Sequence, residues 1–341
     1  MARIAVALSG GVDSAVAAWL LGQQGHQVLG LSLSLGQGPD EAPLAGAQAA
    51  RQLGVPHQVV EAGEEFHQEV VLHSLRAYAR GVTPNPCARC NARVKLPLLW
   101  RAARELGCQG LATGHYARIV DGPQGPCLAE ASHQAKSQAY FLARVDPAML
   151  GQLVFPLGEL AKPQVRDLAR RVGLTAAQRA ESQDACFLPP GGWDQLMAAH
   201  DLLRPGPLED QTGKVLTTHG GIHRFTIGQR RGLGVALGCP TYVLALDGER
   251  SAVRVGPAQG LMSRGLWGDS PRWFAPPDPG LSLRVRVRYA HQGVGCRVSE
   301  EGDRLLVEFQ EPQRAVAPGQ LAVFFHRDQV LGSAWITKAI Y

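Results

Sequence analysis

The sequence lacks the features of a membrane or secreted protein. No apolar run in its 341 residues approaches the ~18 that a membrane span requires. Gly10, Gly11 and Asp13 stand where a signal peptide would need its apolar core. Charged residues are scarce, at 18%, but apolar residues make up 45%, which argues against disorder. We therefore expect a folded cytoplasmic protein of two or three domains with no membrane segment.

Common catalytic signatures are also missing. The sequence contains no HExxH, so nothing indicates a zinc hydrolase. Its glycine-rich segment has no Gly-Lys-Ser/Thr ending, which argues against a Walker-type ATPase that transfers a γ-phosphate. The number of cysteines, seven, is odd. In a cytoplasmic chain such cysteines favour thiol chemistry or metal ligation over a disulfide scaffold.

The net charge of +5 is unevenly distributed. Residues 1–220 hold 19 basic and 19 acidic side chains, whereas residues 221–341 hold 15 and 10. Within the neutral part lies a basic stretch with Glu105 as its single acid. We expect a polyanion to be held between this stretch and the C-terminal third; the alternative is a solvated basic helix face. The stretch comprises Arg76, Arg80, Arg89, Arg93, Lys95, Arg101, Arg104 and Arg118.

Strand and helix patterns alternate in the N-terminal part. An apolar run at 3–8, a glycine turn and an apolar helical pattern at 12–21 form the first unit. The pattern repeats with strands at 28–35, 57–60 and 110–113 and helices at 44–53, 64–79 and 94–106. Short links between them predict an α/β fold with a doubly wound parallel sheet, whose ligands bind at the carboxyl ends of the strands.

The pattern changes after about residue 203. Short strands then alternate with Gly and Pro turns, as in a small barrel or sandwich. We predict a catalytic domain at 1–203, a small central β-rich domain at 204–270 and a C-terminal β-barrel at 271–341. In the barrel, Arg284, Arg286 and Arg288 alternate along one strand, which favours phosphate contact by that face.

The segment Ser9-Gly10-Gly11-Val12-Asp13-Ser14 joins the first strand to the first helix. Its two glycines let the backbone approach an anion closely, and the helix N-terminus offers free N–H groups and a positive dipole. This pattern favours a phosphate cradle over a purely structural turn.

Two cysteines follow a proline-rich loop in Thr83-Pro84-Asn85-Pro86-Cys87-Ala88-Arg89-Cys90-Asn91. Their spacing puts both sulfurs within reach of one metal or of each other. The basic residues around them predict lowered thiol pKa values. Cys186, 96 positions after Cys90, would by itself be more typical of a buried apolar thiol than of a nucleophile.

Together the motifs resemble the tRNA-specific 2-thiouridylases over nearly the whole chain, in the order found in that family of pyrophosphate-loop enzymes. The motifs are Ser9–Ser14, Thr83–Asn91, Ala112–Tyr116, Gln138–Leu142, Phe155–Gly158, Glu181-Ser182 with Cys186-Phe187, Phe225–Gly234, and Arg288-Tyr289 with Pro318–Gln320.

The resemblance implies an adenine-nucleotide α-hydrolase-like fold and specific site residues. Cys186 matches the cysteine that carries a persulfide, and Cys90 matches its partner thiol. The residues implied to bind ATP are Ala7, Leu8, Ser9, Gly10, Gly11, Val12, Asp13, Ser14, Leu33 and Gly114. Those implied to contact tRNA are Asn85, Pro86, Cys87, His115, Lys136, Ser137, Gln138, Arg288, Tyr289 and Gln320.

Three positions depart from the family pattern. Cys87 replaces an Asp, which removes a carboxylate and adds a third thiol to Cys90 and Cys186. Three thiolates can hold a [4Fe-4S] cluster with one open iron, so we favour a cluster-dependent variant over a persulfide relay between Cys90 and Cys186. Ser137 also replaces an Asp, and the link at 36–43 is short.

The function implied is ATP-dependent 2-thiolation of the wobble uridine, position 34 of tRNA. ATP with Mg²⁺ would adenylate uracil O2, and sulfur would attack C2 and release AMP. The partners would be tRNA and a sulfur source, which is a persulfide carrier, a cysteine desulfurase or inorganic sulfide. One alternative is another pyrophosphate-loop enzyme, of the 4-thiouridine, lysidine or amide-forming type. The other is a non-catalytic RNA-binding iron–sulfur protein.

Overall fold

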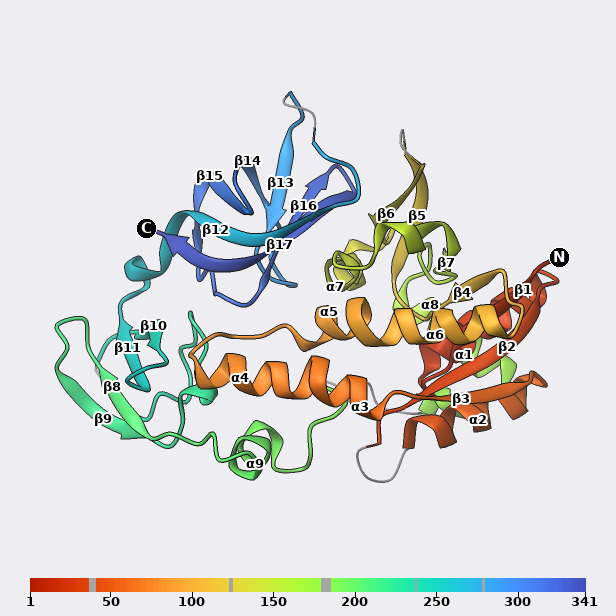
Figure 1. Cartoon of the computed structure of the whole chain (residues 1–341), viewed down its shortest axis with the longest axis horizontal. Helices are drawn as coiled ribbons and strands as arrows, with labels where there is room; N and C mark the ends of the chain where they lie inside the picture. Colours follow the sequence, from red (N-terminus) through yellow and green to blue (C-terminus); the bar gives the residue numbers. More distant parts are fainter. Residues whose placement is uncertain (37–40, 123–124, 179–184, 237, 278–279) are drawn as a thin grey trace.

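The computed structural model describes residues 1–36, 41–122, 125–178, 185–236, 238–277 and 280–341. Figure 1 shows an α/β part around the N-terminus, a small β part with β8–β11 and a β-barrel that ends at the C-terminus. Among the described helices, none is long and apolar enough to cross a membrane.

The N-terminal part is built on a five-stranded parallel sheet of order β3-β2-β1-β4-β7, which confirms the predicted doubly wound architecture. Apolar strands are buried because helices cover the sheet. The strands are β1 (Arg3–Ala7), β2 (Gln27–Ser34), β3 (His57–Glu61), β4 (Gly110–Ala112) and β7 (Leu153–Val154). The longer helices around them are α1 (Val12–Gln23), α2 (Glu41–Leu53), α6 (Leu96–Glu105) and α8 (Lys162–Val172).

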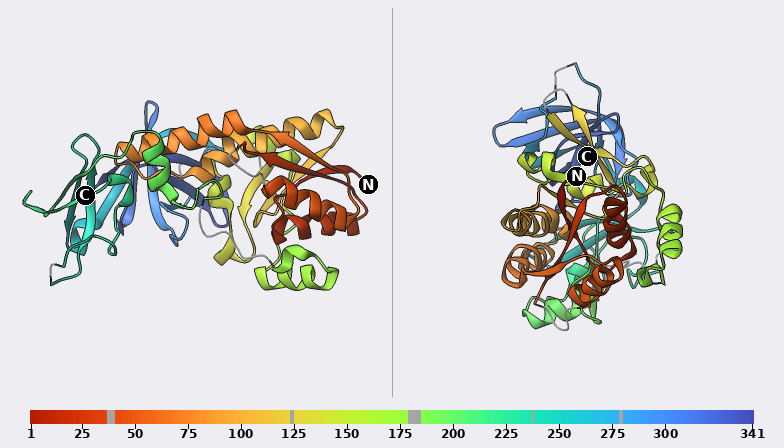
Figure 2. Two further views of the ribbon diagram at one scale, coloured as in Figure 1. Left: turned by 90° about the horizontal axis from the view of Figure 1, so that it is seen from below. Right: turned by 90° about the vertical axis from the view of Figure 1, so that its right-hand side faces the viewer.

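Two helical stretches extend from this sheet toward the β-rich end of the molecule (Figures 1 and 2). The first comprises α3 (Gly63–Phe66), the π-helical η1 (His67–Leu72) and α4 (His73–Ala79), as the periodicity predicts. The second comprises α5 (Pro86–Cys90), the π-helical η2 (Asn91–Lys95) and α6. It begins eight residues before the predicted start at 94, so Cys87 and Cys90 lie on a helix rather than in a loop. Asn85 caps this helix by accepting a hydrogen bond of 3.1 Å from the Ala88 N–H, and Pro86 fits its first turn.

Short helices connect the remaining segments. They are η3 (Gln134–Lys136), α7 (Ala139–Leu142), η4 (Pro147–Gln152), η5 (Thr175–Gln178), α9 (Gly192–Ala199), η6 (Ile222–Arg224) and η7 (Ala258–Leu261).

The central part has a four-stranded sheet of order β10-β11-β8-β9. Its strands are β8 (Gly206–Glu209), β9 (Val215–His219), β10 (Tyr242–Asp247) and β11 (Ala252–Gly256). The barrel follows with β12 (Met262–Trp273), β13 (Leu283–Arg286), β14 (Val294–Glu301), β15 (Arg304–Arg314), β16 (Leu321–His326) and β17 (Gln329–Ile340), and β12 closes it by pairing with β17. The predicted boundary near 270 falls inside β12, so we propose that the barrel domain begins at Met262.

A hairpin from the N-terminal part joins the barrel sheet, which the sequence patterns did not indicate. It consists of β5 (Ala117–Gly122) and β6 (Gly125–Glu130), and β6 adds to β17. Glu130 is 1% exposed and accepts hydrogen bonds from Arg286 Nη1 at 2.6 Å and Arg284 Nη2 at 2.8 Å. Glu130 engages both guanidinium groups and offsets one of their two positive charges, which argues against the predicted phosphate contact by Arg284 and Arg286. Arg288 is exposed.

The catalytic part and the barrel also share one hydrophobic core. It combines sheet residues such as Ala5 and Leu31 with barrel residues such as Val323 and Phe325. Tyr140 is fully buried in it, and its hydroxyl donates to the Leu321 carbonyl at 3.1 Å. This continuity fixes the barrel against the site described below.

We expect Glu130→Gln to destabilise the protein by about 3 kcal/mol, because it leaves two arginines without their buried carboxylate. Urea unfolding followed by tryptophan fluorescence measures the change. Glu308→Gln, which removes an exposed carboxylate from β15, is the matched control and should change stability by less than about 0.5 kcal/mol. Equal effects of the two variants would contradict the role given to Glu130.

Candidate active site

The turn between β1 and α1 has the shape that the phosphate cradle requires. Gly10 adopts a φ of +75°, and a Cβ there would lie 2.1 Å from the Ala45 Cβ, so only glycine fits. The Ser14 hydroxyl donates to the Gly11 carbonyl at 3.0 Å and fixes the first turn of α1. Gly114 packs on this turn, since a Cβ at that position would lie 2.7 Å from the Ser14 nitrogen. The predicted nucleotide residues from Ala7 to Ser14 and Gly114 thus meet at the carboxyl ends of β1 and β4, and Leu33 lies near the end of neighbouring β2.

Lys162 escaped the sequence analysis, and Tyr116 appeared there only as part of a motif, without a role of its own. Lys162 Nζ donates to both carboxylate oxygens of Asp13, at 2.8 and 2.7 Å, and the Tyr116 hydroxyl donates to the same carboxylate at 2.8 Å. Lys162 opens α8 shortly after the Phe155–Gly158 motif, and its position at the start of a helix was the available signal. A lysine beside a phosphate cradle provides a cation for an anionic ligand.

The cysteines of α5 and Cys186 lie near one another. Cys186 interacts electrostatically with both Cys87 and Cys90. Phe187 holds the segment after Cys186 in place, because its ring packs edge-on against Phe66 with 5.4 Å between centroids. Cys90 packs against the same apolar cluster, so the structure brings the three predicted thiols to one place.

The expected lowering of the thiol pKa values is not observed. Burial raises the pKa of Cys87 and Cys186, and it raises the pKa of Cys90 to about 12. The positive charge of Lys95 opposes this rise at all three thiols but is the smaller effect. The other basic residues between Arg76 and Arg118 do not offset this rise in the thiol pKa values, because removal from water directly destabilises the thiolate.

All seven cysteines are free thiols in this structure. Within the described ranges, no three His, Cys, Asp or Glu side chains converge as metal ligands. The positions of the described side chains thus give no support to the predicted [4Fe-4S] cluster at Cys87, Cys90 and Cys186. Three of the remaining cysteines, Cys108, Cys127 and Cys296, are buried like small hydrophobic residues.

Several residues expected to contact tRNA have structural partners. Gln320 donates from Nε2 to the carbonyls of Thr83 and Pro84, at 3.2 and 3.0 Å, and so fixes the barrel to the loop before α5. Tyr289 stacks on Phe141 with ring centroids 4.7 Å apart.

Ser137 and Lys136, neighbouring residues that were both expected to contact tRNA, differ strongly in exposure. Ser137 is 1% exposed and accepts a hydrogen bond from the Ala131 N–H, whereas Lys136 is exposed. Gln138 accepts a hydrogen bond from the Tyr116 N–H at 3.0 Å through Oε1. Glu181-Ser182, of the motif before Cys186, lies outside the described residues.

His115 and Lys95 connect the nucleotide turn with the thiols. His115 directly follows Gly114 and forms a 2.7 Å hydrogen bond between its Nδ1 and the Thr113 hydroxyl. Burial and the charge of Lys95 hold the pKa of His115 well below its usual value, so the ring is neutral at pH 7. The charge of Lys95 therefore influences both the histidine beside the nucleotide turn and the three thiols.

These features define a nucleotide-binding enzyme of the HUP type with appended β domains. A family model described as "tRNA methyl transferase HUP domain" matches residues 2–190. The "tRNA methyl transferase PRC-barrel domain" matches 197–257, and the "Aminomethyltransferase beta-barrel domain" matches 263–336.

Curated relatives agree over the full length. A "tRNA-specific 2-thiouridylase MnmA" from Trichlorobacter lovleyi is 44% identical and covers 99% of this chain and 98% of its own. Proteins of the same description from Syntrophotalea carbinolica and Chloroflexus aurantiacus are 44% and 42% identical, with 98% and 99% of both chains covered. The chain belongs to the tRNA-specific 2-thiouridylase family.

The rate at which the Cys90 thiol is alkylated should reflect how strongly burial raises its pKa. Because the pKa of Cys90 is raised to about 12, we expect iodoacetamide to alkylate Cys90 more than tenfold more slowly at pH 8 than free cysteine, with a rate that still rises above pH 9. Mass spectrometry of the Cys90 peptide over a pH series measures this. Lys95→Met should slow the reaction further, and a plateau below pH 8 would contradict the assignment.

Proposed function

We propose that this protein catalyses ATP-dependent 2-thiolation of the wobble uridine of tRNA. The observation that carries this proposal is the tight glycine turn at the end of β1, on which Gly114 packs, together with the cysteines of α5 and Cys186. The charge of Lys95 acts both on His115, beside that turn, and on the three thiols. A phosphate-binding turn and three thiols whose surroundings are influenced by the same lysine suit a reaction in which ATP activates a carbon for attack by sulfur.

ATP would bind with its phosphates on the turn from Ser9 to Ser14. Backbone N–H groups and the α1 dipole would face the phosphates, and Lys162 would add a positive charge. Mg²⁺ is commonly held by one or two carboxylates and by substrate phosphates. Asp13 is the carboxylate at this turn and fits that pattern, and the metal would neutralise phosphate charge during adenylation.

The target uridine would be activated at O2. Its oxygen attacks the α-phosphate, pyrophosphate leaves, and AMP becomes the leaving group on C2. Asn85, Pro86 and Cys87 lie at the start of α5, where the family resemblance places the base. We assign further tRNA contact to the exposed Lys136 and Arg288, and indirect roles to Gln138, Tyr289 and Gln320, whose partners are within the protein.

Sulfur would arrive as a persulfide on Cys186, which is exposed enough to meet a donor. The terminal sulfur attacks C2, and AMP leaves with the former O2 oxygen. Cys90 then attacks the Cys186 sulfur, which breaks the S–S bond, leaves sulfur on the base and forms a Cys90–Cys186 disulfide. An external thiol reductant resets the enzyme. The donor to the reduced enzyme would be a persulfide carrier or a cysteine desulfurase. Inorganic sulfide would instead attack the Cys90–Cys186 disulfide left by the previous turnover, which breaks the S–S bond, forms the Cys186 persulfide and releases the Cys90 thiol.

Burial has a clear consequence for this relay. The raised thiol pKa values keep Cys90 and Cys186 protonated and protect them from oxidation between turnovers. The positive charge of Lys95 favours the thiolate of each and opposes the effect of burial. We therefore assign Lys95 the role of stabilising the thiolate that attacks.

Purified protein with ATP, Mg²⁺, a persulfide donor, a thiol reductant and tRNA should form 2-thiouridine at position 34 and release AMP. Cys186→Ser should abolish thiolation and AMP release but retain tRNA-dependent release of pyrophosphate in the adenylation step, which a coupled pyrophosphatase assay follows. Lys162→Met should reduce adenylation and thiolation at least tenfold because the phosphate site loses its cation. Cys239→Ser, at an exposed isolated cysteine, is the matched control and should retain activity. Nucleoside mass spectrometry and AMP chromatography measure the products; 4-thiouridine, or no tRNA-dependent AMP, would refute the proposal.

The role of the third thiol can be tested separately. The persulfide relay uses Cys90 and Cys186 only, so Cys87→Asp should retain thiolation, and anaerobically purified protein should be active without bound iron. Iron and sulfide analysis beside the activity assay measures this. Iron and sulfide in stoichiometric amounts, with loss of both cluster and activity in Cys87→Asp, would instead support a cluster held by Cys87, Cys90 and Cys186.

A further inference from the structure

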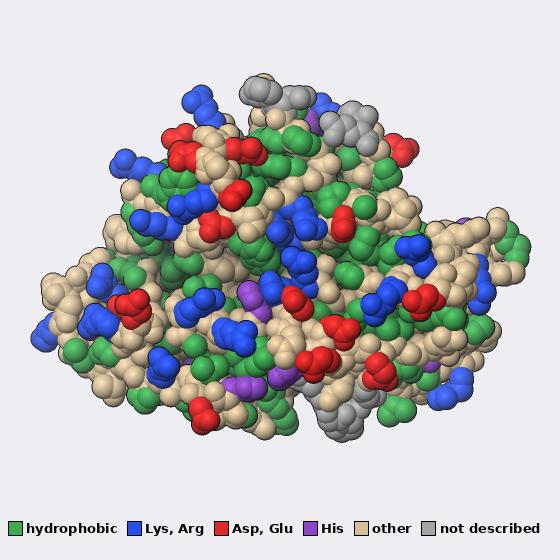
Figure 3. All heavy atoms as spheres, viewed as in Figure 1, with side chains coloured by type: hydrophobic (Ala, Val, Ile, Leu, Met, Phe, Trp, Pro, Cys, Tyr) green, Lys and Arg blue, Asp and Glu red, His purple; other side chains and the backbone are tan. Residues whose placement is uncertain are grey.

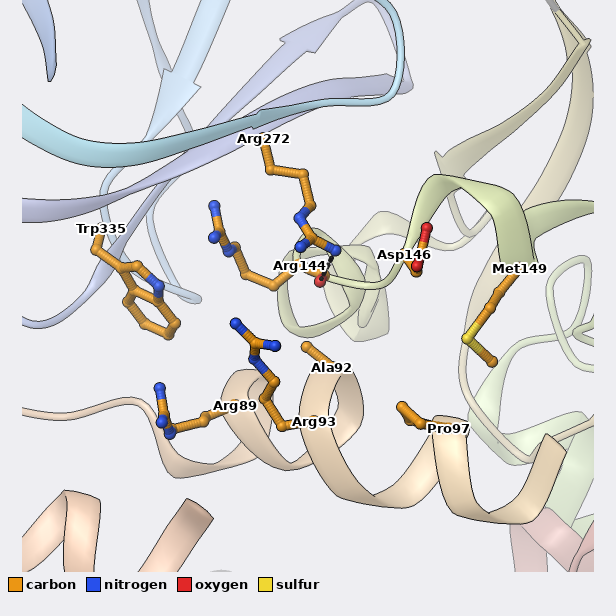
Figure 4. Close-up of a pocket in the computed structure, with 9 residues that line it drawn as sticks. All are labelled: Arg89, Ala92, Arg93, Pro97, Arg144, Asp146, Met149, Arg272 and Trp335. Atoms are coloured by element: carbon orange, nitrogen blue, oxygen red, sulfur yellow. Dashed lines mark hydrogen bonds between the residues drawn. The ribbon is translucent and has the colours of Figure 1, made fainter. Parts of the chain in front are cut away.

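A basic pocket lies outside the site described above, between the α5–α6 stretch and the barrel (Figure 4). It has a volume of about 300 Å³. Four arginines line it from separate elements: Arg89 on α5, Arg93 on η2, Arg144 just after α7 and Arg272 on β12. In Figure 4, Arg93, Arg144 and Arg272 point into the space between the helix and β12.

The positive charges of this pocket are poorly neutralised. Arg89 is paired with Glu69 at 2.7 Å, but Arg93, Arg144 and Arg272 form no ion pair with any described carboxylate. Asp146 lines the pocket without an ion pair to these arginines. Like charges held together raise the electrostatic energy of the empty pocket, and an anion would lower it.

Arg144 is the most constrained member. It is 9% exposed, and its Nη1 donates to two barrel carbonyls, those of Ser270 at 2.7 Å and Ser333 at 3.3 Å. Burial, Arg272 and Arg93 together lower its pKa to about 10. Arg272 in turn donates to the Arg144 carbonyl at 3.2 Å, so neutral backbone acceptors hold both guanidinium groups in place without compensating their charge.

The surroundings favour RNA over a small anion. Arg76 is on α4 with Arg80 directly after it, and Arg101 and Arg104 are on α6. Figure 3 shows Lys and Arg side chains gathered over these helices and below the barrel. A row of positive charges matches the regular negative charges of a nucleic-acid backbone. Arginine also binds phosphate oxygens in a bidentate manner.

We propose that this pocket binds a backbone phosphate of the tRNA substrate, an inference that rests on the proposed function. Arg93 lies one helical turn after Cys90, so a phosphate bound here would sit about 5 Å further along the helix that carries the thiols. This contact raises the affinity for tRNA and fixes the position of the tRNA along the protein, but it recognises no base.

Arg93→Gln is the sharpest test, because Arg93 is exposed and has no hydrogen bond or ion pair among the described residues. We expect the slope of log K against log salt to fall by about 1 and tRNA affinity at 0.1 M salt to fall about fivefold, since one phosphate contact releases ~0.7 of a counterion. Arg171→Gln, at an exposed arginine of α8, is the control and should change neither. Fluorescence anisotropy with labelled tRNA over a salt series measures both.

Two further measurements identify the ligand. Phosphate-ethylation interference should reveal at least one tRNA phosphate whose modification weakens the wild-type protein but not Arg93→Gln. Binding of inorganic pyrophosphate, measured by calorimetry, should be the same in both proteins. Unchanged tRNA affinity and salt slope in Arg93→Gln, while the wild type still thiolates tRNA, would overturn the pocket assignment and leave the proposed function intact. Weaker pyrophosphate binding would assign the pocket to a small anion instead.

Discussion

The start of helix α5 is the constraint on which both faces of the molecule depend. Asn85 caps the helix, Pro86 fits its first turn, and Gln320 of the barrel holds the two carbonyls that precede it. This short segment begins the helical stretch that carries the thiols Cys87 and Cys90 and the pocket arginines Arg89 and Arg93. The barrel therefore acts on the catalytic part through backbone contacts and not only as an added surface.

The folded structure shows which basic residues have carboxylate partners and which remain available to bind an anion. Several basic residues of the sequence already have carboxylate partners, among them Arg284 and Arg286, which share Glu130, and Arg118, which pairs with Asp328. These pairs hold the β5–β6 hairpin against the barrel. Arg93, Arg144 and Arg272, which have no ion pair with a described carboxylate, line the pocket at α5–α6, so net charge per segment is a poor guide to where an anion binds.

Burial and charge compete at the thiols, and burial is the larger effect. A basic neighbourhood in sequence suggested thiolates, but most of those side chains face elsewhere, and Lys95 is the cation that acts on all three sulfurs. The same lysine acts on His115, which joins the nucleotide turn to the thiols. One partly exposed cation, Lys95, thus acts on groups that stand on different elements.

The sequence by itself determined the parallel sheet, the Ser9–Ser14 turn and the family, because these depend on local periodicity, on glycine conformations and on contiguous motifs. It also indicated Cys90 and Cys186 as partners. Only the tertiary structure decided that α5 begins at Pro86, that Lys162 meets Asp13, that β6 joins the barrel and that Arg144 is buried beside Arg93 and Arg272. Each of these joins residues distant in the chain, and their contacts arise from packing that no local pattern encodes.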